Sequence, residues 1–88
     1  MTNEEIDKIL GEYKNSLSDY KLYPIEKLEE INKQYKTEEL IPGMLMIGSN
    51  GGGEALGIDM RKDSKTYQSL FRVSFIPLAW KEAVFLEK

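Results

Sequence analysis

The chain has 88 residues, of which 41% are hydrophobic and 31% charged, which is typical of one small soluble domain spanning residues 1–88. It contains no cysteine and no histidine, which excludes disulfides, thiolate metal sites and the side chains most often used in acid–base and nucleophilic catalysis. The net charge of −3 and the scattered basic residues speak against a nucleic-acid partner, and no apolar run approaches the roughly 20 residues that a membrane span needs.

The first half of the chain predicts two helices. Its N-terminus is acidic where a signal peptide would be basic, so we expect a cytoplasmic protein. Thr2 or Asn3 can cap a first helix, whose apolar residues recur at helical spacing at Ile6, Ile9, Leu10 and Tyr13. Pro24 fits the first position of a second helix. The apolar residues of this second helix are Ile25, Leu28, Ile31 and Tyr35.

The second half of the chain predicts strands. Residues 44–49 form a short apolar run after the Pro42-Gly43 turn, as expected of a buried strand. Residues 54–60 alternate between two faces. In the segment 66–75 one face carries the pattern of a half-buried strand. The residues on that face are Tyr67, Phe71, Val73 and Phe75.

The last segment, residues 78–88, fits either a short helix or a final strand. The spacing of Trp80, Val84 and Phe85 favours the helix. Because the predicted helices precede the predicted strands, we expect an α+β fold. In this fold, N-terminal helices pack on one face of a small, mainly antiparallel sheet with a glycine-rich hairpin.

The glycine run at Asn50, Gly51, Gly52 and Gly53 lies between two of the predicted strands. A phosphate-binding loop would need a lysine and a hydroxyl residue after the glycines, and a dinucleotide fingerprint would need a helix there. Instead Glu54 follows, and the next residues alternate as in a strand. The sequence therefore favours a β-hairpin with Asn50-Gly51 at the centre of a type I′ turn, in which Gly52 and Gly53 allow a bulge or a close backbone approach.

Three carboxylates, Glu54, Asp59 and Asp63, are the candidates for chemistry. Such groups bind hard cations or act as general acid and base, which leaves a carboxylate-dependent metal hydrolase as a remote alternative. The residues that follow Asp59, Met-Arg-Lys, match no calcium loop, so a solvated turn is the preferred interpretation. We therefore predict no catalytic residue, no metal and no cofactor. Trp80 is interpreted as part of the core or of an interface rim.

Several of these features together resemble the SUKH superfamily, the Smi/Knr-type domain of fungal cell-wall regulators and many bacterial immunity proteins. In that family a helix ending in Asn-x-x-Tyr leads to a Pro-Gly turn, an apolar strand, a Gly-Gly-Gly-Glu hairpin and an acidic residue that closes the next strand. The matching residues here are Asn32 and Tyr35, Pro42 and Gly43, Leu45 to Gly48, Gly51 to Glu54, and Asp59. The resemblance covers about residues 22–86, and the chain is shortened at both ends relative to the family pattern.

The resemblance implies a non-catalytic protein-binding domain. It points to an immunity protein that neutralises a cognate bacterial toxin, such as a nuclease, by covering the toxin's active site. The alternatives are an adaptor or regulator of the Smi/Knr type and a mobile-element remnant without activity. We expect the partner to contact the acidic helical half and the residues Glu54, Asp59, Asp63 and Trp80, and the sequence leaves a homo-oligomer open.

Overall fold

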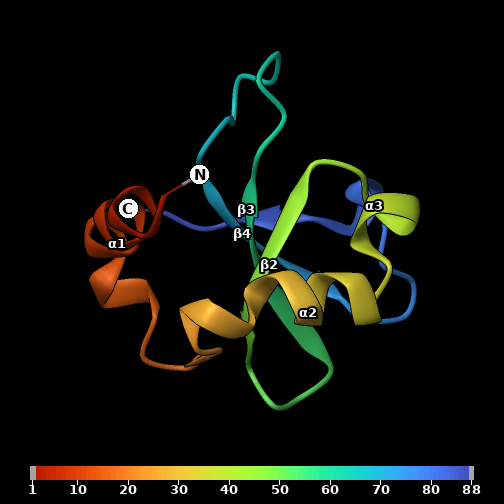
Figure 1. Ribbon diagram of the computed structural model, residues 1–88, viewed down its shortest axis with the longest axis horizontal. Coiled ribbons are helices and arrows are strands. Elements are labelled where there is room, and N and C mark those ends of the chain that lie inside the picture. The colour runs from red at the N-terminus through yellow and green to blue at the C-terminus, as the bar shows by residue number, and fades with distance from the viewer. Residues whose placement is uncertain (1, 88) are drawn as a thin grey trace.

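A five-stranded antiparallel sheet forms the centre of the molecule in the computed structural model, which describes residues 2–87. The strands lie side by side in chain order and are β1 (Lys21–Leu22), β2 (Met44–Ser49), β3 (Glu54–Asp59), β4 (Leu70–Ser74) and β5 (Val84–Phe85). The helices are α1 (Asn3–Glu12), α2 (Leu28–Gln34) and α3 (Thr37–Leu40). Figure 1 shows α1 at the left of the strands and α2 crossing in front of them. The predicted α+β fold is confirmed.

Helix α1 begins with a capping box. The Thr2 hydroxyl accepts a hydrogen bond from the Glu5 backbone N–H at 3.2 Å, and the Glu5 carboxylate accepts one from the Thr2 N–H at 3.1 Å. Of the two predicted caps, Thr2 is therefore the one used. The buried face of α1 presents Ile6, Ile9 and, at its C-cap, Tyr13 to the sheet. No helix within residues 2–87 has the length and apolar character to cross a bilayer.

Strand β3 lies in the middle of the sheet and is buried on both faces. Leu56 and Ile58 point toward α1, whereas Ala55 points to the opposite face. That opposite face is covered by Ile41 and by the C-terminal segment with Leu78. The molecule therefore has two small apolar clusters, one on each side of the sheet.

The prediction of a half-buried strand over 66–75 is wrong on two points. The strand begins only at Leu70, and Leu70 is as buried as Phe71 although their side chains point to opposite faces. Tyr67 lies outside the strand in the β3–β4 connection and is 36% exposed. This connection, residues 60–69, projects as an arm at the top of Figure 1.

Asn32 fixes α2 along the edge of β2. The Asn32 Oδ1 accepts a hydrogen bond from the Met46 N–H at 2.7 Å, and its Nδ2 donates to the Met46 carbonyl at 3.0 Å. Strand β1 pairs with β2 only at Gly48 and Ser49. The Asn32 carboxamide therefore provides the backbone N–H and carbonyl of Met46 with the hydrogen bonds that a neighbouring strand would otherwise make. The same Nδ2 also donates to the Leu28 carbonyl at 2.8 Å. The hydrogen-bonding capacity of this side chain is thus used to join helix and sheet.

The predicted second helix forms and ends at Tyr35 as expected, but its first turn is a 3₁₀ turn. Pro24 has an extended ψ of 136° and stands before a 3₁₀ turn, Ile25–Lys27, which leads into α2. Lys36 then adopts a left-handed conformation with φ of 56°, and α3 follows. Of the predicted apolar stripe, only Leu28 is buried. Tyr35 is 39% exposed, and its ring stacks on Phe75 at a centroid distance of 5.3 Å.

The predicted glycine hairpin joins β2 and β3, but its turn type is wrong. A type I′ turn would need a positive φ at Asn50, and only Gly51 (φ 73°) and Gly53 (φ 96°) have one in this loop. Instead the Asn50 side chain closes the loop, because its Oδ1 accepts from the N–H groups of Gly52 at 2.8 Å and Glu54 at 3.1 Å. The bulge also lies elsewhere, in β2 between Met46 and Gly48.

The C-terminal segment forms a strand, so the preference for a helix is wrong. One 3₁₀ turn, Trp80–Glu82, is followed by β5, which pairs with β4. The reason is the aromatic contact across this pair, since Phe85 lies opposite Phe71 and their rings are 5.3 Å apart.

We predict that Asn32→Ala lowers the free energy of unfolding by about 2 to 4 kcal/mol, because it leaves the N–H and carbonyl of the fully buried Met46 without partners. Urea denaturation followed by circular dichroism measures the change. Gln34→Ala, at an exposed position of the same helix, is the matched control and is expected to change stability by less than about 0.5 kcal/mol. Equal effects of the two substitutions would contradict this role of Asn32.

Candidate functional site

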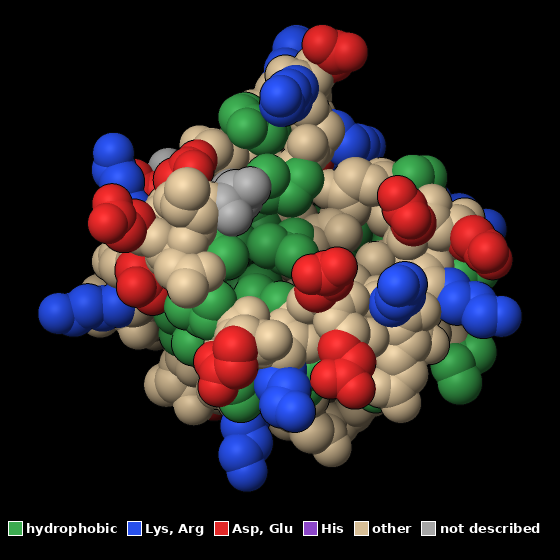
Figure 2. All heavy atoms as spheres, in the orientation of Figure 1, with side chains coloured by type: hydrophobic (Ala, Val, Ile, Leu, Met, Phe, Trp, Pro, Cys, Tyr) green, Lys and Arg blue, Asp and Glu red, His purple; other side chains and the backbone are tan. Residues whose placement is uncertain are grey.

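A groove of about 580 Å³ opens between α1 and α2. Its apolar lining comes from different elements: Ile6 of α1, Ile25 and Leu28 around the start of α2, and Leu45 of β2. Ile6 and Leu28 are buried, whereas Ile25 and Leu45 keep part of their surface accessible. Figure 2 shows this region as a hollow of hydrophobic side chains near the centre of the view, with charged side chains around it.

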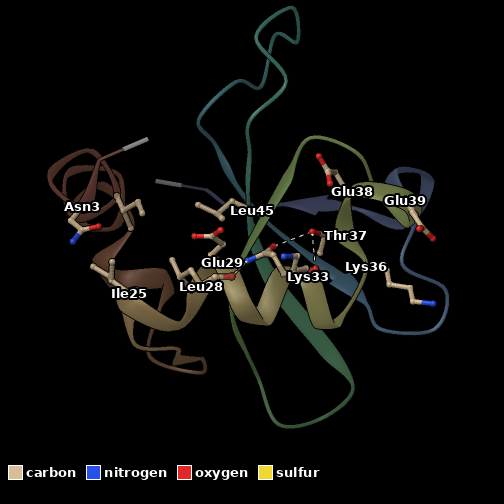
Figure 3. Close-up of a pocket in the computed structure, with 12 residues that line it drawn as sticks. Asn3, Ile25, Leu28, Glu29, Lys33, Lys36, Thr37, Glu38, Glu39 and Leu45 are labelled. Atoms are coloured by element: carbon tan, nitrogen blue, oxygen red, sulfur yellow. Dashed lines mark hydrogen bonds between the residues drawn. The ribbon is translucent and has the colours of Figure 1, made fainter.

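Charged residues stand along the rim of the groove. Glu29 and Lys33 come from α2, Lys36 follows it, and Glu38 and Glu39 belong to α3. In Figure 3 the Glu29 side chain lies beside Leu45, whereas the α3 carboxylates lie at the far end of the groove from Asn3 and Ile25. None of the three glutamates forms an ion pair with a cation of residues 2–87.

The three helices themselves carry a net negative charge. They carry eight exposed acidic residues and two exposed lysines, which are Glu4, Glu5, Asp7, Glu12, Glu29, Glu30, Glu38 and Glu39 against Lys8 and Lys33. The whole chain has a net charge of −3, so the helices hold −6 and the rest of the chain holds +3. The acidic helical half expected from the sequence is therefore concentrated on the helices that flank the groove.

Asp59 does not belong to an accessible surface, and its expected exposure is wrong. Its side chain is 0% exposed. Its two carboxylate oxygens accept hydrogen bonds from the Arg61 guanidinium at 3.0 and 2.9 Å and from the Thr66 hydroxyl at 2.6 Å. Arg61 is close in sequence and turns back over the end of β3 because its own N–H also donates to Asp59 at 2.9 Å. The bidentate pair between Arg61 and Asp59 lies at the end of β3 and fixes the start of the arm 60–69.

The same hydrogen bonds control the ionisation of Asp59. Burial by itself would raise the pKa, but the hydrogen bonds from Arg61 and Thr66 outweigh it and lower the pKa from 3.8 to about 2. Asp59 is therefore a carboxylate held in its charged form by the fold. An acid–base role near neutral pH is incompatible with this value.

Trp80 is also engaged within the molecule. Its indole N–H donates to the Pro42 carbonyl at 2.7 Å, and its ring packs on Phe71 at 4.8 Å. The Arg61 guanidinium lies over the indole ring of Trp80, 3.6 Å from the centre of the ring, and forms a cation–π contact. Gly43 permits the approach, because a Cβ at its φ of 91° would come within 2.4 Å of Arg61 Cγ. Trp80 thus ties the C-terminal segment to the turn before β2 and is half-buried there.

The other two predicted carboxylates lie apart from Asp59. Glu54 is at the opposite end of β3, about 16 Å away by the rise of a six-residue strand, and pairs with Arg72 at 2.7 Å. Asp63 is exposed on the projecting arm. The arrangement therefore does not unite the residues of the hypothetical metal hydrolase. Within residues 2–87 no group of three acidic side chains is placed to hold a metal ion.

The sequence could not identify the groove because its lining comes from separate segments. Leu45 belongs to an apolar run typical of a buried strand, and Ile25 and Leu28 belong to an ordinary helical stripe. The only available signal was the excess of acidic residues in the first half of the chain. This excess indicates a charged side of the molecule without indicating a hollow.

No family model and no curated protein sequence matches the chain. The resemblance of residues 22–86 to the SUKH superfamily therefore stays a prediction.

We predict that the stability of the protein falls steeply as the pH drops from about 4 to 2. The folded-state pKa of Asp59 lies below its unfolded value, so its contribution is complete above pH 4 and is lost as the pH falls through about 2. The contribution is about 2 kcal/mol. Urea denaturation at pH 7, 4 and 2.5 measures it. Asp59→Asn is expected to be less stable at pH 7 and to lose less stability on acidification, whereas the exposed Asp63→Asn should follow the wild type at every pH.

Proposed function

We propose that the chain is a non-catalytic protein-binding domain that acts in the cytoplasm as an immunity protein and neutralises a cognate bacterial toxin. The observation that carries this proposal is the separation of charge, with −6 on the helices around the groove and +3 on the rest of the chain. The resemblance to immunity proteins supports the same conclusion independently. The expected partner is a toxin domain with a basic surface, of which nucleases are the common kind because they bind phosphates.

Electrostatics explains why this arrangement suits an inhibitor. An inhibitor must reach its target before the target acts, so the association rate matters as much as the final affinity. A surface of one sign raises the rate of encounter with an oppositely charged partner by one to three orders of magnitude at low salt. The exposed carboxylates of α1, α2 and α3 provide such a surface on one side of this molecule.

The groove supplies the second requirement of a tight interface, an apolar centre inside a polar rim. Stable protein–protein interfaces have a desolvated core, with charged residues at the periphery where they steer and orient the partner. Here the apolar lining with Leu45 has charged residues along its rim, which are Glu29, Glu38 and Glu39 together with Lys33 and Lys36. The same side of the molecule therefore combines a steering field with a surface that gains from being covered.

We predict that the chain protects cells against the toxin-domain protein encoded by the adjacent gene and co-purifies with it. Glu29→Lys/Glu38→Lys is expected to lower the association rate by about tenfold at low ionic strength, because it removes negative charge at the groove. Survival of co-expressing cells and surface-immobilised binding kinetics are the measurements.

Glu82→Lys/Glu87→Lys is the matched control, since it makes the same change of charge at exposed positions outside the three helices. It is expected to change the association rate much less than the groove variant. Full killing in the presence of the wild-type chain contradicts the immunity function. Equal effects of the two double variants would instead place the partner elsewhere on the surface.

A further inference from the structure

We infer that the groove between α1 and α2 receives a basic amphipathic helix of the partner, which inserts large apolar side chains against Leu45 and places lysine or arginine along the rim. This inference rests on the proposed function, because it names the part of the partner that the groove would hold. It is carried by the shape of the groove, by the state of its polar groups and by its charge.

The shape of the groove suits one face of a helix. The lining runs from Asn3 and Ile25 at one end to Thr37 and Glu39 at the other, as Figure 3 shows. A volume of about 580 Å³ holds several large apolar side chains but not a whole helix. A helix lying along the groove would therefore insert the side chains of one face, at positions i and i+4, and remain outside with its backbone.

The buried polar side chain of the groove is already used. Asn32 lines the groove, but its amide bonds Met46, Leu28 and Thr37. Within residues 2–87 no buried side-chain nitrogen or oxygen lacks a hydrogen-bond partner. The polar groups that the groove still offers to a ligand are the charged side chains of its rim. What the groove offers is therefore apolar contact and a charged rim, which are the means of peptide recognition by a helix groove.

The charge of the rim specifies a basic occupant. Glu29, Glu38 and Glu39 have no cationic partner within the described chain, whereas the rim lysines Lys33 and Lys36 offset part of their charge. Three glutamates against two lysines leave the charged lining of the groove with a net charge of −1. Lysine or arginine on either side of the inserted face would pair with these carboxylates. An acidic helix of the same shape would be repelled.

A display library of helical peptides, randomised at every position and selected on the purified full chain, tests the inference. We expect the selected peptides to carry large apolar residues at i and i+4 with flanking lysine or arginine, and amide NMR shifts to change around Leu45 and Glu29. Selection of acidic or non-amphipathic peptides, shifts confined to another surface, or no enrichment at all would each overturn it.

Two variants and their matched controls sharpen the test. Leu45→Trp fills the groove and Glu29→Lys reverses charge at an exposed rim position, so each is expected to weaken binding of a selected peptide at least tenfold. Ile76→Trp, at a position that is 89% exposed outside the groove, and Glu82→Lys are expected to leave the affinity within twofold of the wild type. If Leu45→Trp does not fold, the Glu29→Lys variant alone tests the inference. Unchanged affinity of this variant for the selected peptide would overturn it.

The outcomes separate this inference from the proposed function. If the chain selects basic helices in the groove but protects against no toxin, the inference stands and the proposed immunity function is rejected. If a Glu29→Lys/Leu45→Trp variant still folds and protects cells fully, the proposed function stands and the inference about the groove is rejected.

Discussion

The hydrogen bonds between the Asn32 carboxamide and the backbone of Met46 determine how this small domain is arranged. They hold α2 against β2, with Leu28 packed in the same apolar cluster as Ile6 and Ile9 of α1. The space between the two helices becomes the groove. Met46 is fully buried, so water cannot replace these bonds, and the position of the helix is tied to the integrity of the strand.

Much of the fold could be predicted because its signals are local. The strand over 44–49, the hairpin that follows it and the Thr2 cap each depend on residues adjacent in sequence. The failures have a common physical cause, which is competition from distant contacts. The helical spacing of Trp80, Val84 and Phe85 is overruled by the pairing of β5 with β4, and the expected exposure of Asp59 is overruled by its hydrogen bonds with Arg61 and Thr66.

The candidate site likewise combines features that local sequence indicates with features that depend on contacts between distant segments. Asp59 reads as an accessible acid at the end of a strand, yet the chain folds Arg61 and Thr66 back over it and makes it a buried structural carboxylate. Trp80 was predicted to lie in the core or at an interface rim, and in the fold it is half-buried, with its indole N–H donating to Pro42 and its ring in contact with Phe71 and Arg61. The groove depends on the spacing between α1 and α2, which no periodicity in the sequence encodes. Its acidic rim is the one part that composition indicated.

The order of the strands has a consequence for how the chain folds. Because β1 to β5 lie in the sheet as they follow in the chain, every strand pairs with the strand that precedes or follows it. Chain entropy opposes the pairing of remote segments most strongly, and this topology avoids the longest closures. The sheet can grow outward from the glycine hairpin one strand at a time, so a domain with a thin core and no covalent cross-links reaches its native topology by short steps.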